Sequence, residues 1–169
     1  MASGAFFNPR TLLMVTPLIS STVTVWYSWD QDFFLGLLTR RIEPAKANAI
    51  LPSYITGMFY RGTAAVVGVV AVTFWSSLAN IWLYRPVLQS HGSLRWYAWA
   101  AILSAGHIAW VPGVAWKLKA VMDDASEDEG TTNVGMMDRW LRVNLARMVT
   151  TDLSAWVCAV VAVTSTLSA

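Results

Sequence analysis

The chain has 169 residues, of which 56% are hydrophobic and only 13% charged, and its formal net charge is +2 at pH 7. This composition is more apolar than that of a soluble domain, and the length suits one compact bundle, so we expect a single membrane domain over residues 1–169. The small, scattered positive charge argues against a nucleic-acid partner. One cysteine, Cys158, excludes an intramolecular disulfide.

Four long uncharged segments dominate the sequence, at residues 11–29, 62–84, 96–116 and 148–169, and only Asp152 interrupts the last one. About 20 mostly apolar residues are needed for a helix to cross a bilayer. Because lipid cannot satisfy free backbone amides, each segment is predicted to be a transmembrane helix. The predicted fold is therefore all-α, an integral membrane antiparallel four-helix bundle whose main partner is the lipid bilayer.

The first segment carries a polar stripe of Thr16, Ser20, Thr24 and Tyr27 at helical spacing. The segment is longer than the apolar part of a signal peptide, and no small-residue cleavage site follows it, so we expect a retained span. Its stripe should face the bundle interior. Such hydroxyl groups either line a semi-polar cavity or only bond neighbouring helices together.

The connection over residues 30–61 is amphipathic and contains Pro44 and Pro52. Its apolar run at residues 33–38 is too short to cross a bilayer, so we predict a helix lying at the membrane interface. The next connection, residues 85–95, is short and should join antiparallel neighbours. The third, residues 117–139, contains an acidic block and is predicted to be a solvated loop without a chemical role.

The distribution of Lys and Arg predicts the orientation. Most of them lie in or beside the first and third connections, whereas Arg10, Arg85 and Arg95 lie at the opposite ends of the spans. The positive-inside rule then places both termini away from the cytosol. We expect a multi-pass protein of an endomembrane such as the endoplasmic reticulum.

Three ionisable residues fall in or beside the predicted spans, and such residues are costly in lipid and therefore candidates for function. Asp152 lies about one turn into the fourth span, His107 near the middle of the third, and Arg147 just before the fourth. Pro112 should kink the third helix just beyond His107. There is an alternative explanation for each residue. Asp152 would only hold helices together through an ion pair or hydrogen bond, and His107 would only pack in the core with its polar atoms hydrogen-bonded.

The same region carries a second polar stripe and several deep aromatic residues. Spacings of three and four place on one helical face the residues Asn144, Arg147, Thr151, Ser154 and Cys158. Three tryptophans away from the span ends, Trp75, Trp110 and Trp156, together with Thr151, are predicted to wall a pocket for a flat hydrophobic substrate. Packing alone is the alternative explanation for these tryptophans.

Known cofactor patterns are not found in the sequence. The two histidines, His91 and His107, do not form a zinc-binding pattern, no Glu-x-x-His spacing of a di-iron bundle occurs, and no Gly-x-Ser-x-Gly elbow is present. If the protein is an enzyme, we expect it to work without a tightly bound metal or nucleotide.

The segment Trp140-Leu141-Arg142-Val143-Asn144-Leu145-Ala146-Arg147, followed by an apolar final helix, resembles the closing segment of a known family. These are the small four-helix membrane proteins that include fungal anthrone oxygenases. The resemblance extends loosely over the whole chain. Residues 54–62 are similar to the entry of the family's second helix, and residues 107–118 take the place of its third-helix end.

The resemblance implies a monooxygenase of secondary metabolism that converts the methylene of an anthrone-type polyketide to a carbonyl. Molecular oxygen would be the co-substrate, and no cofactor would be needed. Either Asp152 or His107 would be the base, Arg147 and Asn144 would hold the substrate oxyanion, and Tyr60 would position a phenol.

Two other functions fit the same residues. A membrane-bound cyclase or isomerase of a lipophilic biosynthetic intermediate also needs a buried acid and an aromatic wall. A non-catalytic tetraspan scaffold would instead recruit partner biosynthetic enzymes through its acidic loop.

Overall fold

The computed structural model describes residues 8–168, and within this range every regular element is a helix. The all-α prediction is therefore confirmed. The elements are α1 (Pro9–Arg40), α2 (Pro44–Ser90), α3 (Leu94–Ala109), α4 (Val111–Met122), α5 (Asn133–Arg147), a π-helix η1 (Met148–Asp152) and α6 (Leu153–Leu167).

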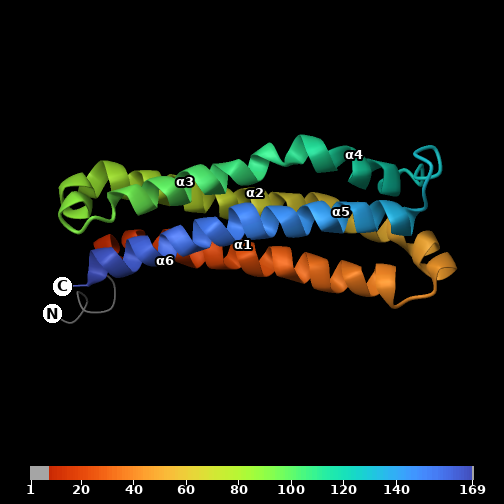
Figure 1. Cartoon of the computed structure of the whole chain (residues 1–169), viewed down its shortest axis with the longest axis horizontal. Helices are drawn as coiled ribbons and strands as arrows, with labels where there is room; N and C mark the ends of the chain where they lie inside the picture. Colours follow the sequence, from red (N-terminus) through yellow and green to blue (C-terminus); the bar gives the residue numbers. More distant parts are fainter. Residues whose placement is uncertain (1–7, 169) are drawn as a thin grey trace.

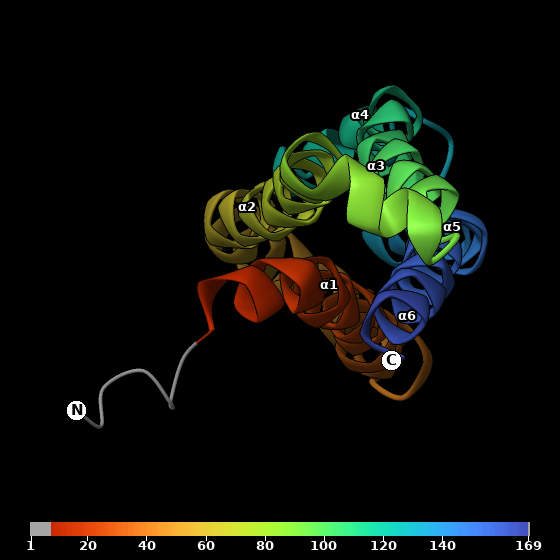
Figure 2. The ribbon, with the colours of Figure 1, turned by 90° about the vertical axis from the view of Figure 1, so that its left-hand side faces the viewer.

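The helices form four rods that lie side by side along the length of the molecule (Figure 1). The rods are α1, then α2, then α3 with α4, then α5 with η1 and α6. The chain reverses between consecutive rods, so both ends of the described chain lie at the same end of the molecule. Seen along the rods, α1 packs against α2 on one side and against α5 and α6 on the other (Figure 2).

Three helical stretches within the described residues are long and apolar enough to cross a membrane: Pro44–Ser90, Leu94–Met122 and Asn133–Leu167. The helix α1, in which a fourth span over residues 11–29 is predicted, is not one of them. Between its apolar residues lie hydroxyl side chains such as those of Ser20, Ser21 and Thr22, which lower its mean hydropathy.

The connections are shorter than the sequence predicts. The apolar run at residues 33–38 does not form a separate interfacial helix but the last turns of α1, which ends only at Arg40. Pro44 then begins α2, where its fixed backbone angle suits the first turn. Likewise α4 continues to Met122 and α5 begins at Asn133, so the acidic loop is confined to residues 123–132.

The helices are packed by different kinds of side chain at the two ends of the bundle. At the end with residues 41–43 and 123–132, large side chains form an apolar core that includes Leu35, Leu51, Ile55, Met136, Met137 and Leu141. Toward the termini, small residues such as Ala100 and Ala159 bring α3 and α6 together. Small residues allow the close helix approach that is typical of membrane bundles.

Hydrogen bonds across the helices accompany this close packing. The Thr73 hydroxyl donates to Ser20 Oγ at 2.7 Å, and Asn80 Nδ2 donates to the Leu13 carbonyl at 2.8 Å. Tyr97, which is completely buried, donates to the Met14 carbonyl at 2.9 Å. The hydroxyl stripe of α1 thus contributes at Ser20 to helix–helix bonding.

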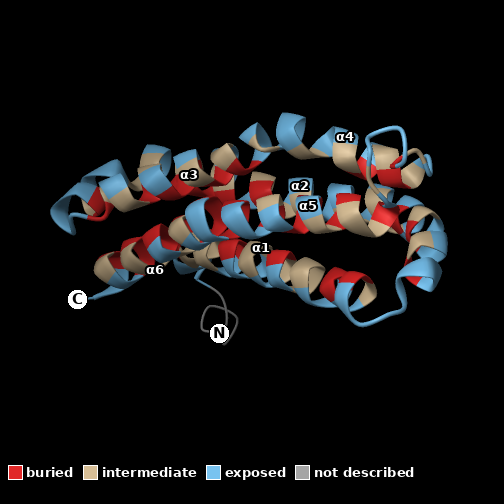
Figure 3. Ribbon diagram, turned by 45° about the vertical axis from the view of Figure 1, so that its right-hand side comes forward, coloured by how far each residue is buried: buried red, intermediate tan, exposed pale blue. Residues whose placement is uncertain are grey.

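Buried residues follow the inner faces of the rods (Figure 3). The outer faces are nevertheless rich in large apolar side chains. Trp26 is 66% exposed and Trp82 is 83% exposed, and exposed Ile, Val and Phe side chains accompany them. A soluble monomer rarely shows apolar surface on this scale, whereas lipid covers such a surface at no cost.

We predict that Tyr97→Phe lowers the free energy of unfolding by about 0.5–1.5 kcal/mol, since it removes the buried hydrogen bond from the Tyr97 hydroxyl to the Met14 carbonyl. Unfolding of the purified protein in a denaturing detergent measures this. Tyr60→Phe is the matched control, because Tyr60 is 72% exposed. Equal stability of the two variants would show that the Tyr97 hydroxyl contributes nothing.

Candidate active site

A buried polar network surrounds Asp152, whose residue surface is only 3% exposed. His107 Nδ1 lies 2.8 Å from Asp152 Oδ1, and the Ser28 hydroxyl donates to Oδ2 at 2.9 Å. Arg147 Nε lies 3.4 Å from the same Oδ2. Both carboxylate oxygens of Asp152 are therefore occupied by groups from three other helices.

Arg147 and Asn144 extend the network along α5. Arg147 Nη2 donates to Asn144 Oδ1 at 2.6 Å and to Ser28 Oγ at 3.0 Å. Asn144 Nδ2 in turn donates to the Ser28 carbonyl at 3.2 Å. The positive charge of Arg147 and the negative charge of Asp152 balance each other. Each buried ion needs this partner, because a buried charge without one strongly destabilises the fold.

The contact with Asp152 fixes the protonation pattern of His107. A carboxylate only accepts hydrogen bonds, so the proton of the neutral imidazole lies on Nδ1 and Nε2 keeps its lone pair. A histidine oriented in this way by a buried carboxylate can take up a proton at Nε2, because the carboxylate stabilises the resulting imidazolium.

The π-helix η1 brings Asp152 to this position. In a regular α-helix, two residues five positions apart point about 140° away from each other. The wider turn at Met148–Asp152 places residues five apart nearly above one another, so Asp152 lies on the same side as Arg147. Short π-helical turns occur frequently at functional sites.

A break in the third rod follows His107 directly. The helix α3 ends at Ala109, and α4 begins at Val111 with Pro112 in its first turn, so the predicted kink is confirmed. Proline has no N–H to continue the helical hydrogen bonds. At the break, Trp110 Nε1 donates to the Thr151 hydroxyl at 2.9 Å and ties the kink to η1.

A cavity of about 140 Å³ lies beside the network, between α2 and α4. His107 and Arg147 belong to its wall, and most of the other wall residues are apolar. These others are Gln31, Phe59, Gly62, Thr63, Val66, Val67, Ile108, Val111, Val114, Ala115, Leu118 and Trp140. Because Asp152 and Asn144 do not line the cavity, His107 and Arg147 are the network members that can touch a molecule inside it.

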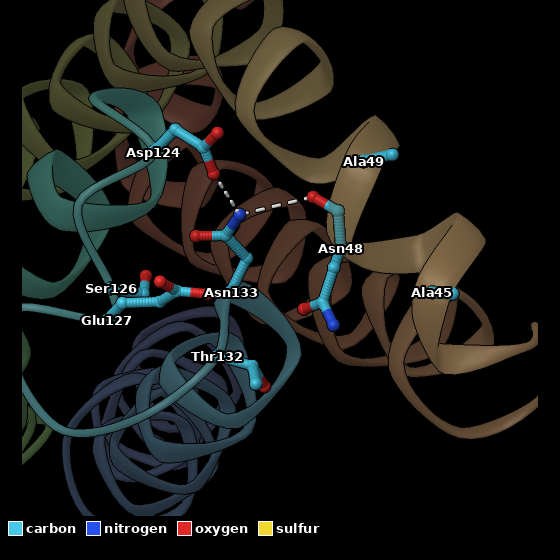
Figure 4. A pocket seen from close by; sticks show the side chains of 8 residues that line it. All are labelled: Ala45, Asn48, Ala49, Asp124, Ser126, Glu127, Thr132 and Asn133. Atoms are coloured by element: carbon cyan, nitrogen blue, oxygen red, sulfur yellow. Dashed lines mark hydrogen bonds between the residues drawn. The ribbon is translucent and has the colours of Figure 1, made fainter.

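A second, more polar cavity of about 390 Å³ lies where the acidic loop meets the start of α2 (Figure 4). There, Asn133 Nδ2 donates to Asp124 Oδ1 at 2.6 Å and to the Asn48 carbonyl at 3.1 Å. None of the predicted site residues lines this cavity. Its hydrogen bonds anchor the loop to α2.

The structure brings together four of the five predicted catalytic residues, namely Asp152, His107, Arg147 and Asn144. The fifth, Tyr60, is 72% exposed on the outer face of α2 and takes no part in the network. Its expected role in positioning a phenol inside the site does not fit this placement.

The predicted aromatic wall is not formed by the three tryptophans. Trp75 is 65% exposed. The inner face of α2 is formed here by the buried Ser76 and Ser77, and Trp75 lies on the outer face. Trp156 donates to the Thr22 hydroxyl at 2.9 Å on the outer side of α1 and α6. Trp110 and Thr151 bond to each other next to the network, but neither lines the cavity beside it.

Two residues without a predicted role turn out to be central. Ser28 bonds Asp152, Arg147 and Asn144, and it lies four residues after Thr24, so an extension of the hydroxyl stripe would have found it. Trp140, which lines the cavity, belongs to the recognised motif. Within residues 8–168 there is no group of three His, Cys, Asp or Glu side chains placed to hold a metal ion.

Three fungal proteins are similar to almost the whole chain. A probable epoxidase (scpX) of Mollisia scopiformis is 26% identical over 89% of this chain and 93% of its own length. An epoxidase (pydX) of an Acremonium species is 26% identical over 91% of this chain and 93% of its own length. An epoxidase (gkaX) of Penicillium citrinum is 27% identical over 92% of this chain and 95% of its own length.

These relatives fit the predicted resemblance to the anthrone oxygenase-like family of small fungal membrane proteins, and they support an oxidative enzyme of the oxygenase type. No family model matches the chain. No solved structure matches it either.

We predict that Asp152→Asn destabilises the protein by about 3–5 kcal/mol, because it leaves the buried Arg147 charge without a partner. The double variant Asp152→Asn/Arg147→Gln should lose less than the sum of the single variants, with a coupling of about 0.5–3 kcal/mol. Thermal unfolding measures all three. Arg142→Gln is the control at an exposed arginine of the same helix, and strict additivity would show that the ion pair is uncoupled.

Proposed function

We propose that this chain, like the oxygenase family that it resembles, is a membrane-embedded oxygenase acting on a lipophilic aromatic or polyketide intermediate of secondary metabolism. The observation that carries the proposal is the His107–Asp152 pair at the wall of an apolar cavity. Such a pair supplies a base in a site from which lipid and protein exclude water.

The surface supports the membrane part of the proposal. Three rods are long and apolar enough to cross a bilayer, and large apolar side chains face outward on all four. We propose that α1 crosses as the fourth span, because it lies against both α2 and α6 and bonds to α2 at Ser20. The hydroxyls of Thr16, Ser20, Ser21, Thr22 and Thr24 also donate to carbonyls of α1 itself, as Thr16 does to the Leu12 carbonyl at 2.7 Å, which lowers the cost of lipid contact.

In the proposed reaction, His107 Nε2 removes a proton from an acidic carbon of the substrate, such as an anthrone methylene. The carbanion is delocalised onto a neighbouring oxygen, which lies against the Arg147 guanidinium. Asp152 stabilises the imidazolium, and Asn144 is a positioning residue that holds Arg147. Electrostatic stabilisation of the developing oxyanion is commonly the largest catalytic contribution.

The carbanion then reacts with molecular oxygen, which the substrate itself reduces. The new C–O bond gives a peroxide anion, which takes the proton back from His107 to form a hydroperoxide. Loss of water from the hydroperoxide leaves a carbonyl, so a methylene and O₂ yield a ketone and H₂O. All electrons come from the substrate, and for this reason we propose that no metal, flavin or external reductant takes part.

The names of the three relatives favour epoxidation as a second outcome of the same chemistry. A hydroperoxide formed in the cavity can pass its outer oxygen to a carbon–carbon double bond of the same substrate. The products are an alcohol and an epoxide, and the atoms of one O₂ are all accounted for. Proton abstraction without oxygen would instead make the protein an isomerase or cyclase.

We predict that His107→Gln lowers oxygen consumption at least about 100-fold with anthrone as substrate, since glutamine can donate to Asp152 but cannot act as a base. Oxygen uptake and carbonyl product are measured together on protein in nanodiscs. His91→Gln, at the exposed end of α2, should keep full activity. An active His107→Gln variant would remove the proposed base, and turnover without oxygen uptake would favour the isomerase.

The proposed orientation places the ends of the described chain on the lumenal side of an endomembrane such as the endoplasmic reticulum, where partner biosynthetic enzymes would meet the acidic loop from the cytosol. In a Cys158→Ala background, Ser90→Cys should react with an impermeant thiol reagent only from the lumen and Asp128→Cys only from the cytosol. Both positions are exposed at opposite ends of the bundle. Labelling of both from one side would contradict a bundle that crosses the bilayer.

A further inference from the structure

The Tyr27 side chain lies between the cavity beside the network, here called the network cavity, and two further cavities along the contact of α1 with α2. The Val23 cavity measures about 60 Å³ and is lined by Val23, Thr24, Tyr27, Ala65, Val66 and Val69. The Tyr54 cavity measures about 140 Å³, and its wall includes Tyr27, Gln31, Leu35 and Tyr54. Val66 and Gln31 each also line the network cavity. Because they share wall residues, the three cavities adjoin one another around Tyr27.

The hydroxyl of Tyr27 lies directly against α2 at Gly62. A Cβ atom at position 62 would lie 2.7 Å from Tyr27 Oη, which is closer than Cβ atoms approach other groups in proteins. Glycine weakens the interior of a helix relative to alanine, so a glycine here is explained by the close approach of Tyr27. Gly62 lines the network cavity, whereas Tyr27 does not. The end of the Tyr27 side chain thus closes the network cavity at Gly62.

Tyr27 has empty space on two sides, because it lines both the Val23 cavity and the Tyr54 cavity. Protein interiors are generally close-packed, and a ring enclosed on all sides cannot turn without moving its neighbours. Side chains move between a few staggered rotamers when space allows. The Tyr27 ring can therefore turn away from Gly62 into a neighbouring cavity without a shift of either helix.

The sizes of the cavities show what such a turn would change. The network cavity, at about 140 Å³, is close to the roughly 150 Å³ cavity that accommodates benzene, so it holds one ring. Sites that enclose a drug-sized molecule measure about 300–1,000 Å³. The network cavity joined to the Tyr54 cavity approaches this range. Fused rings therefore fit only when Tyr27 no longer separates the two cavities.

We propose that Tyr27 is a specificity-determining residue: placed against Gly62 it limits the network cavity to one aromatic ring, and turned aside it joins this cavity to the Tyr54 cavity for a polycyclic molecule. This inference rests on the proposed function and concerns how the same site selects its substrate by size. His107 lies at the wall of the network cavity in either arrangement, so one ring of the polycycle reaches the proposed base.

The test records methyl NMR spectra of the protein with ¹³C-labelled Leu and Val methyl groups in phosphatidylcholine nanodiscs, with anthracene or toluene added. A bound aromatic ring shifts the resonances of nearby methyl groups. Of the three cavities, Val114 lines only the network cavity and Leu35 only the Tyr54 cavity. Val157 is 45% exposed and lines none of them, so it reports molecules dissolved in lipid.

Anthracene should shift the Val114 and Leu35 resonances with one and the same binding curve, because a single molecule spans both cavities. Different binding curves at the two residues, or a shift of Val114 without Leu35, would overturn the joining of the cavities.

Tyr27→Ala removes the partition, so the affinity for anthracene should rise about tenfold while the affinity for toluene changes less than about twofold. Tyr54→Ala is the matched control, because Tyr54 lines the Tyr54 cavity but not the network cavity. It should keep the wild-type preference for toluene over anthracene. An equal gain for anthracene in both variants would show that added space alone matters and would overturn the role of Tyr27.

Gly62→Ala tests the same contact without shortening Tyr27. The new methyl group must push the hydroxyl away, so anthracene should again gain relative to toluene. Adding Tyr27→Phe should restore the wild-type preference, because Cζ of the ring would lie 3.9 Å from the new methyl group. The control is Gly68→Ala, where an added Cβ would meet no other helix or side chain of the described chain within 4 Å. A wild-type preference in Gly62→Ala would contradict the partition.

Binding and turnover are read separately in this design. Suppose that the wild type consumes oxygen with anthrone while Tyr27→Ala and Gly62→Ala keep the wild-type preference; this would overturn the role of Tyr27 alone. A changed preference in both variants, without any oxygen consumption by the wild type, would overturn the oxygenase and leave size selection by Tyr27.

Discussion

The burial of one ion pair is the constraint on which the arrangement of this bundle depends. Asp152 and Arg147 are both at least nine-tenths buried, and neither charge is tolerated there without the other. The groups that satisfy the pair come from α1, α3 and α5, so these three helices must keep one relative position. The interaction that makes the site chemically useful therefore also holds the helices in register.

The same constraint explains why the polar residues have unequal roles. Asp152 is fully occupied by its partners, and Asn144 only holds Arg147, so both act through other residues. His107 and Arg147 line the cavity, and His107 uses only Nδ1 in the network. The proposed base and the proposed oxyanion partner are thus held in place by residues that do not line the cavity.

Much of this could be predicted from the sequence, because the cost of a charge in lipid points directly to Asp152, His107 and Arg147. The helical stripe also predicts that Asn144 lies with Arg147. Regular helical geometry fails at Asp152, since nothing in the residue pattern announces the π-turn that rotates it toward Arg147. It fails again for Trp75 and Tyr60, because an aromatic side chain suits a lipid-facing surface as well as a pocket, and only packing distinguishes the two.

The length of α2 has a consequence for where the bundle ends relative to the bilayer. Its 47 residues measure about 70 Å along the helix path, which kinks at Tyr84, and this is more than twice the roughly 30 Å of hydrocarbon. If the end with small residues and hydroxyl bonds is the part immersed in lipid, the other end projects into water, and its core of Leu, Ile and Met is the kind that soluble bundles use. His107 lies 13 residues beyond Leu94, about 20 Å along α3. In the proposed orientation, the His107 side chain then lies in the third of the bilayer nearest the cytosol, where lipid-dissolved molecules and water are both within a few turns of helix.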